Sequence, residues 1–420
     1  MDSLIFPELS LPYMSYPGLS LRACFFLGIV QKKVNERGYK SHEKRTRRTM
    51  KILYDHQTFA MQEYGGISRY FIELMNQFRI NKEMGVSFEL ALHYSNNEYL
   101  PQYPSFKYHR LFPDCNCRGK GPFLNFVNKP YSRTALLKGN HDLVHPTYYD
   151  PYYLKYLRGK SFVITVHDMI HELYPQSFPK YDRTRAYKRL VIGRASAIIA
   201  VSQNTKEDVL TFYDVDPAKI EVIYHGSSFQ IERVSFAQKD RQLDEKYLLF
   251  VGNRRQYKNF NFFITSVASI LQNNPDLKVI CAGGGAFSED EQKLLERLSI
   301  QNQVVQVRTD DDGLKRLYSK AIAFIFPSLY EGFGIPVLEA FACRCPALLS
   351  NTGSLPEVGG DAALYFDPTD SESLRSAITD VLEDEKLRDK LIHAGLKQLG
   401  KFSWERTAWE TKIVYEKSLP

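Results

Sequence analysis

Two carboxylates and two glycines stand close together in residues 327–339, and their types suit a ligand that has both phosphate and hydroxyl groups. Glu331 precedes Gly332 and Gly334, and seven residues separate it from Glu339. Glycines let a backbone approach a ligand closely, and a helix start favours negative charge beside its free N–H groups. Carboxylates accept hydrogen bonds from hydroxyls. This pattern predicts a sugar-nucleotide site.

The elements around this segment are a strand and a helix. The apolar run 321–326 predicts a buried strand, and residues 336–343 predict a helix with Pro336 in its first turn, where a missing N–H costs nothing. We therefore expect a strand-to-helix corner. Spacing alone leaves another interpretation open, in which Glu331 is a solvated loop charge and Glu339 only complements the helix dipole.

The nonapeptide Ser-Leu-Tyr-Glu-Gly-Phe-Gly-Ile-Pro at 328–336, with its spaced glutamates, resembles the signature of retaining GT-B glycosyltransferases of family 4. The likeness extends from residue 50 to the end. It implies two doubly wound Rossmann-like α/β domains that face each other across a cleft. It also implies that Glu331 lies by the donor sugar, that Phe333 and the flanking glycines belong to the donor site, and that Glu339 holds the ribose.

The same resemblance implies the reaction. A hexose, with mannose slightly favoured, would move from a nucleotide-diphosphate sugar to a hydroxyl of a glycan or lipid-linked acceptor, with retention, in surface polysaccharide or lipopolysaccharide assembly. A GT-B epimerase or phosphorylase is the main alternative. A nucleic-acid-binding protein is a weaker one, so we expect no nucleic acid partner.

Cations follow the strand predicted at 247–252. Arg254, Arg255 and Lys258 precede a helix, where they could neutralise a departing diphosphate. The family pattern often has Arg directly after the strand's glycine and Lys six residues after it. Lys258 matches the second position, but Asn253 occupies the first, so it stays open whether Arg254 or Arg255 substitutes.

Two further features belong to the first half. Gly65 and Gly66 open an amphipathic helix, and the resemblance implies that donor and acceptor lie against such a loop. His167 ends an apolar strand, and the resemblance implies that it reaches the donor sugar. A lone His at a strand end also suits a purely structural role. The pair of His167 and His171 does not indicate a metal site, because it follows a strand and no HExxH pattern is present.

No cofactor is expected, and we expect activity to be metal-independent. Residues 310–312, three aspartates, precede a helical pattern and suit a helix cap better than a metal site. The chain has six cysteines, of which Cys115 and Cys117, like Cys343 and Cys345, have one residue between them rather than the two of a CxxC motif. We interpret them as reduced thiols of a cytoplasmic protein.

The predicted organisation has five parts. Residues 1–49 are expected to be a disordered leader, a mis-assigned start or a weak surface anchor. Their apolar run is too short to span a bilayer. An acceptor-side domain covers 50–228, a linker 229–246 and a nucleotide-sugar domain 247–400. Residues 401–420 form a helix that crosses back to the first domain.

Charge is unevenly distributed over the chain. The formal net charge is +7, and residues 1–49 hold nine Lys/Arg against four Asp/Glu. Residues 99–160 hold ten Lys/Arg against three Asp, interleaved with aromatic residues. That segment could steer an anionic acceptor or make peripheral contact with the inner face of the membrane, or it could be a solvated face. Both interpretations stay open.

Overall fold

A computed structural model describes residues 49–113, 119–229 and 246–420. The expected leader and the expected linker therefore lie almost entirely outside the described residues. Residues from Thr49 to Pro420 form one compact unit. Within it, all the strand pairings of the described residues are parallel.

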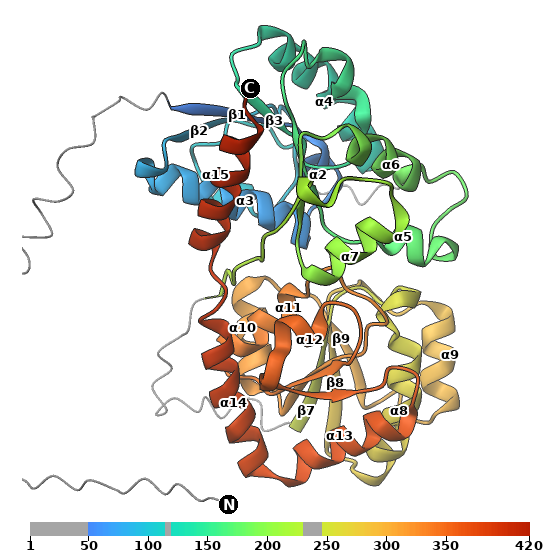
Figure 1. The fold of residues 1–420 in the computed structure, drawn as a ribbon. Coiled ribbons are helices and arrows are strands. Elements are labelled where there is room, and N and C mark those ends of the chain that lie inside the picture. The colour runs from blue at the N-terminus through green and yellow to red at the C-terminus, as the bar shows by residue number, and fades with distance from the viewer. Residues whose placement is uncertain (1–48, 114–118, 230–245) are drawn as a thin grey trace, which may run out of the picture. The chain divides into compact units, whose positions relative to one another are not determined.

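The first half contains two three-stranded sheets (Figure 1). The order of one is β2-β1-β3 and of the other β4-β5-β6, and a bridge between Val144 and Phe162 links them. The strands are β1 (Met50–Tyr54), β2 (Val86–Leu90), β3 (Leu143–His145), β4 (Val163–Val166), β5 (Ala197–Ala200) and β6 (Ile220–Val222). Its helices are α2 (Gln57–Met61), α3 (Gly66–Ile80), α4 (Lys120–Lys138), α5 (Ile170–Leu173), α6 (Thr184–Arg194) and α7 (Gln203–Phe212).

The second half contains one six-stranded sheet of order β12-β11-β10-β7-β8-β9. Its strands are β7 (Lys246–Val251), β8 (Leu277–Ala282), β9 (Val304–Val307), β10 (Ala323–Phe326), β11 (Ala347–Ser350) and β12 (Ala363–Phe366). The order reverses between β7 and β10. In open parallel sheets, ligands bind beyond the carboxyl ends of the strands at such a reversal.

Helices of the second half cover both faces of its sheet. They are α8 (Phe260–Asn273), α9 (Glu289–Arg297), α10 (Asp311–Lys320), α11 (Ile335–Ala342), α12 (Leu355–Gly359), α13 (Ser371–Glu383) and α14 (Glu385–Leu399). Separate apolar clusters pack on the two faces, one against α11 and one against α8 and α13. Both halves are thus Rossmann-like α/β units, as the sequence predicts.

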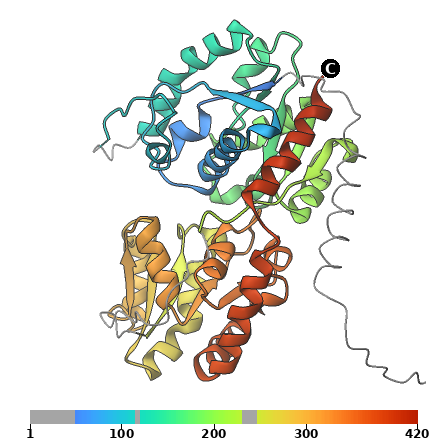
Figure 2. The ribbon, with the colours of Figure 1, turned by 90° about the vertical axis from the view of Figure 1, so that its left-hand side faces the viewer.

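The last helix, α15 (Trp404–Ser418), packs against the first half, beside α3 (Figure 2). The Tyr415 hydroxyl lies 2.9 Å from the Tyr54 hydroxyl and 2.6 Å from Nδ1 of His145. Tyr415 is fully buried, so these polar contacts satisfy its hydroxyl inside the core. Among the residues that the structure describes, no helix is both long enough and apolar enough to cross a bilayer.

Candidate active site

The predicted corner connects β10 to α11. Gly334 is the N-cap of α11 with φ of 97°, a left-handed conformation that disfavours other residues, and Pro336 lies in the first turn. A Cβ on Gly334 would also come within 3.0 Å of Leu355 Cδ2. The turn therefore needs this glycine to redirect the chain from strand to helix.

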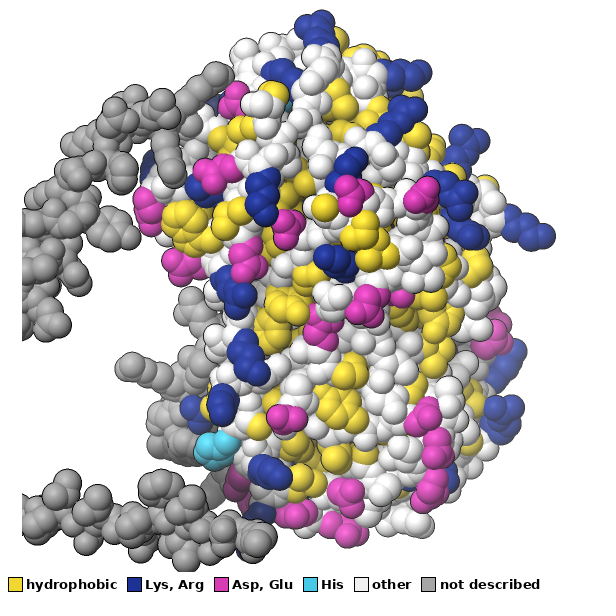
Figure 3. All heavy atoms as spheres, in the orientation of Figure 1, with side chains coloured by type: hydrophobic (Ala, Val, Ile, Leu, Met, Phe, Trp, Pro, Cys, Tyr) yellow, Lys and Arg dark blue, Asp and Glu magenta, His cyan; other side chains and the backbone are white. Residues whose placement is uncertain are grey.

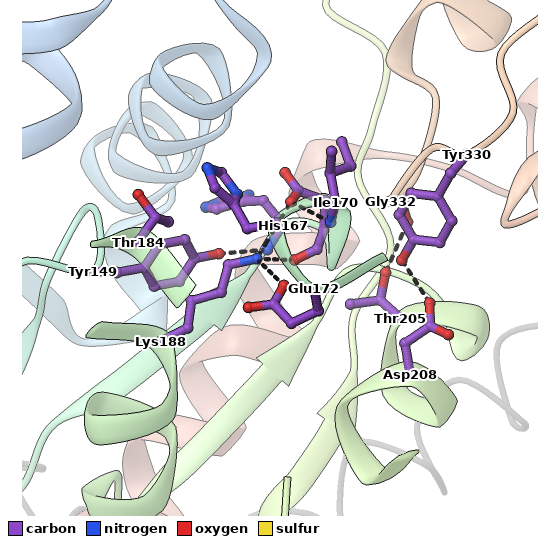
Figure 4. Close-up of polar contacts among 12 residues, drawn as sticks. Tyr149, His167, Ile170, Glu172, Thr184, Lys188, Thr205, Asp208, Tyr330 and Gly332 are labelled. Atoms are coloured by element: carbon purple, nitrogen blue, oxygen red, sulfur yellow. Dashed lines mark hydrogen bonds and ion pairs between the residues drawn. The ribbon is translucent and has the colours of Figure 1, made fainter. Parts of the chain in front are cut away.

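Gly332 packs closely against the first half of the chain. A Cβ at this position would lie 1.8 Å from the carbonyl oxygen of His167. The Gly332 carbonyl accepts a hydrogen bond from Ser202 Oγ at 2.7 Å. It also accepts one from Thr205 Oγ1 at 3.1 Å (Figure 4). This glycine makes room for the backbone of the first half, and it does not line the cavity described below. Phe333 also packs against the first half: it is buried, and its ring centroid lies 4.8 Å from that of His225.

A cavity of about 770 Å³ lies where the sheet order reverses. Four of the predicted site residues line it: Gly65, Gly66, Lys258 and Glu339. Backbone from the ends of β7 and β8 also lines it, at Gly252 and at the three glycines 283–285. The volume suits a ligand of nucleotide-sugar size, because ligand pockets commonly measure about 300–1,000 Å³.

Lys258 and Glu331 form an ion pair, with Nζ 2.6 Å from Oε1. Both side chains are nearly buried, at 12% and 11% exposed. Burial by itself lowers the pKa of Lys258, but the charge of Glu331, the hydrogen bond to Glu331 and the other negative groups nearby together outweigh that effect, so the pKa is raised and the amine stays protonated. Glu331 thus fixes a cation at the wall of the cavity.

Glu339 lies in α11 and is 5% exposed. Its Oε2 accepts a hydrogen bond of 3.3 Å from the Tyr318 hydroxyl. Burial raises the pKa of Glu339, and the positive charge of Arg69 opposes that rise. The carboxylate is available to hydroxyl groups of a ligand in the cavity.

Neither candidate arginine lines this cavity. Arg254 binds Glu291 through Nε at 2.8 Å and donates to the carbonyls of Gly283, Gly285 and Ala286. It therefore shapes the glycine turn after β8. Arg255 lines a separate cavity of about 660 Å³. Two other arginines do line the cavity of about 770 Å³, namely Arg69 and Arg308, and the sequence analysis did not identify them.

His167 is buried, and its Nε2 has no hydrogen-bond partner among the described residues. Burial lowers the pKa of His167 to about 4, so the imidazole is neutral. Its ring packs edge-on against Tyr70, with 5.3 Å between centroids. His167 is not among the residues that line the cavity.

A buried lysine supports the loop after His167 (Figure 4). Lys188 of α6 has a fully buried side chain and donates to the Asp168 carbonyl at 2.7 Å and to Glu172 Oε2 at 3.0 Å. Tyr213 donates to the other oxygen of Glu172 at 2.6 Å. Nothing in the local sequence pattern indicated this cluster.

The start of α7 binds residues of the second half. Backbone N–H groups of Gln203 and Asn204 donate to the carboxylate of Glu357 at 2.7 and 3.3 Å. Tyr330 donates to Asp208 at 2.6 Å. These contacts hold the loop that contains Glu331 against the first half.

The aspartates at 310–312 behave as the sequence predicts. Asp310 is the N-cap of α10 and accepts from the Gly313 N–H at 2.8 Å. Asp311 pairs with Arg69 and Asp312 with Lys315. Within the described ranges, no group of three or more His, Cys, Asp or Glu residues is placed to hold a metal ion.

Comparison with known proteins places this geometry in a family. Residues 64–228 match the family described as Glycosyltransferase Family 4, and residues 232–398 match Glycosyl transferases group 1. The chain is 27% identical over 376 residues to O-antigen chain mannosyltransferase B of Escherichia coli. The aligned region covers 84% of this chain and 96% of that protein. It is 32% identical over 260 residues to O-antigen chain mannosyltransferase RfbU of Salmonella typhimurium, covering 62% and 69%.

Solved structures share the fold. The Anabaena protein HepE, in complex with UDP and glucose, superposes with a TM-score of 0.68 at 18% identity, over 87% of this chain and 99% of that one. At that identity the likeness concerns the fold alone.

Proposed function

This chain belongs to the GT-B glycosyltransferases of family 4, and we propose that it transfers mannose from a nucleotide-diphosphate mannose to a hydroxyl of a glycan or lipid-linked acceptor in surface polysaccharide assembly. The observation that carries the proposal is the cavity at the reversal of the sheet, lined by Lys258 and Glu339. Two bacterial relatives named as O-antigen mannosyltransferases favour mannose over other hexoses.

The donor's parts have partners along the cavity. Glu339 accepts hydrogen bonds from the ribose hydroxyls, since its carboxylate lies on the wall and is largely removed from water. The glycine turns at 252 and 283–285 let the diphosphate approach the backbone. Lys258 supplies positive charge at the end of the cavity nearest Glu331, where the sugar is seated.

Catalysis is mainly electrostatic. The bond between the anomeric carbon and the diphosphate oxygen breaks, and the acceptor oxygen forms a new bond to that carbon with retention. The departing diphosphate receives the acceptor proton, and Lys258 stabilises its negative charge. Glu331 does not act as a glycosidase-type nucleophile here, because it is engaged by Lys258.

Metal-independent transfer is part of the proposal. Two aspartates that line the cavity already have partners. Asp310 caps α10, and Asp311 pairs with Arg69. Lys258 and backbone N–H groups supply the positive potential that a divalent ion supplies in other sugar-nucleotide enzymes.

Peripheral contact with the membrane is also proposed, and it is assigned to α4. Phe123, Phe126 and Leu137 lie along one face of that helix and are 48%, 72% and 42% exposed. Lys and Arg side chains gather over α4 and α6 in the upper part of Figure 3. Exposed aromatic residues among cations favour an anionic bilayer surface, where a lipid-linked acceptor would be found.

The experiment is a donor screen with a defined acceptor. Purified protein is incubated with GDP-mannose, UDP-glucose or UDP-galactose and a mannose-terminated oligosaccharide, with and without EDTA, and product is detected by mass spectrometry. We expect an added hexose from the mannose donor, unaffected by EDTA. Turnover without acceptor, or with phosphate in place of the nucleotide, would instead indicate an epimerase or phosphorylase. Loss of transfer on chelation, restored by manganese, would overturn the metal-independent route.

A further inference from the structure

Arg69 connects two elements on opposite sides of the candidate donor cavity. It lies near the start of α3, three residues after Gly66, and its side chain is 9% exposed. Nη2 donates to Asp311 Oδ1 at 2.7 Å, although 242 residues separate the two positions. Asp311 begins α10 in the second half, so this ion pair joins the two halves at the cavity.

A second contact fixes the orientation of the guanidinium. Cζ of Arg69 lies 4.3 Å from the centroid of the Tyr99 ring, and Tyr99 is itself buried and lines the cavity. A guanidinium over an aromatic face is stabilised by the ring quadrupole. Because Arg69 is held on two sides, it is a preorganised cation and not a mobile surface charge.

The electrostatics tie Arg69 to Glu339. Burial raises the pKa of Glu339, and the positive charge of Arg69 is the largest influence that opposes this rise. Burial by itself lowers the pKa of Arg69, but the negative charges of Glu339 and Asp311 and the hydrogen bond to Asp311 favour the charged guanidinium, and the pKa is raised. The cation and the glutamate, which are both buried, therefore stabilise each other's charged forms.

We infer that Arg69 is a positioning residue for the donor: fixed by Asp311 and Tyr99 in the same cavity as Glu339, it supports that carboxylate as a hydroxyl acceptor and keeps α3 at the cavity. This inference rests on the proposed function, in which Glu339 holds the ribose. Unlike Arg254 and Arg255, Arg69 lines the cavity.

A purely structural role gives a different expectation. An ion pair that only connected the halves would change thermal stability and leave donor affinity largely intact. Positioning through Glu339 instead couples the two residues, so that removing Arg69 matters much less once Glu339 has lost its charge. A double-mutant cycle separates the cases.

The variants are Arg69→Met, which removes the charge, Arg69→Lys, which retains it, and Arg69→Met combined with Glu339→Gln. Arg79→Met is the matched control, because Arg79 lies in the last turn of α3 and is exposed. The measurements are donor KM and kcat, Kd for GDP and UDP by calorimetry, and thermal melts.

We expect Arg69→Met to raise donor KM and nucleotide Kd by about 10- to 100-fold, the range for hydrogen bonds to charged groups, with kcat within about threefold. Arg69→Lys should recover part of the loss, and Arg79→Met should match the parent. In the Glu339→Gln background the further effect should be under about threefold.

Equal effects of Arg69→Met in both backgrounds, or unchanged nucleotide affinity in folded Arg69→Met, would overturn the inference. If the parent protein itself binds no nucleotide and transfers no sugar, the proposed function fails instead. The two failures are therefore distinguishable.

Discussion

At the scale of single residues, Lys258 is the side chain that the proposed mechanism places beside the diphosphate. Its ammonium group is charged, nearly buried and held by Glu331, so its position does not have to be reorganised when the diphosphate departs. A preorganised cation of this kind stabilises the transition state more than the ground state. Its removal should therefore affect turnover more than binding.

We predict that Lys258→Ala lowers kcat by roughly 10²- to 10³-fold, the scale for loss of one preorganised donor, with a smaller change in donor KM. Steady-state kinetics measures both constants. Lys390→Ala, which removes an exposed lysine of α14, is the control. A folded Lys258→Ala variant with nearly normal kcat would remove Lys258 from the diphosphate site.

The pH dependence of donor binding should report Glu339. The charged and titratable groups that face it are Arg69, Asp311, Tyr318 and Tyr99, and burial raises its pKa. Above this raised pKa the carboxylate is ionised and accepts both ribose hydrogen bonds. Donor KM should therefore rise as pH falls through a value above the usual carboxyl range.

Glu339→Gln should have a higher donor KM that no longer changes over that pH range, because the amide does not titrate. Initial rates at several donor concentrations between pH 4 and 8 measure this. A parallel pH profile in both proteins would contradict the assignment.

At the scale of elements, the loop after β10 is held by α7 and by the loop after β4. The glycine at 332 permits that approach, since any Cβ would collide with the His167 carbonyl. Tyr330 and Glu357 add contacts to α7 on either side of it. The position of Glu331 thus depends on backbone packing from the first half.

Gly332→Ala should therefore destabilise the fold by about 1–3 kcal/mol, the usual cost of overpacking, and should also lower activity. Gly193→Ala is a matched control, because Gly193 lies in α6 with open space around its Cα and alanine favours a helix by about 1 kcal/mol. Thermal and urea unfolding measure both. Unchanged stability in Gly332→Ala would show that this backbone contact is absent in solution.

The exposed face of α4 gives a second prediction at this scale. Phe123→Ser with Phe126→Ser should weaken co-sedimentation with vesicles of phosphatidylglycerol and phosphatidylethanolamine several-fold, because each phenylalanine contributes apolar area at the interface. Activity on a soluble acceptor should remain. Tyr181→Ser, which removes an exposed aromatic residue elsewhere, is the control. Equal sedimentation of all three proteins would exclude α4 as the contact.

Local patterns sufficed to predict several elements. The apolar run before 327, the proline at 336 and the aspartate at 310 predicted where β10 ends and where α11 and α10 begin, because caps and periodicity are local properties. Long-range pairs were not predictable in this way. Lys258 pairs with Glu331, which is 73 positions away in the sequence. Arg69 pairs with Asp311, which is 242 positions away. Arg254 suited a diphosphate by type, yet the carbonyls after β8 engage it.

At the scale of the whole molecule, the cavity combines residues from both halves. Arg69 and the paired glycines come from the first half, whereas Lys258 and Glu339 come from the second. Helix α15 returns to pack on the first half and ties the end of the chain to α3. A donor site built in this way needs both halves in place, which suits the transfer of a sugar between two bound substrates.

The most direct test of the account is the anomeric configuration of the product. The protein is incubated with GDP-mannose, whose mannose is α-linked, and a mannose-terminated acceptor, and the new linkage is assigned by NMR. We predict a single added mannose in α-linkage, formed by the parent protein and reduced at least about 100-fold in Lys258→Ala. A β-linked product, or equal α-linked product from both proteins, would contradict retaining transfer at this site.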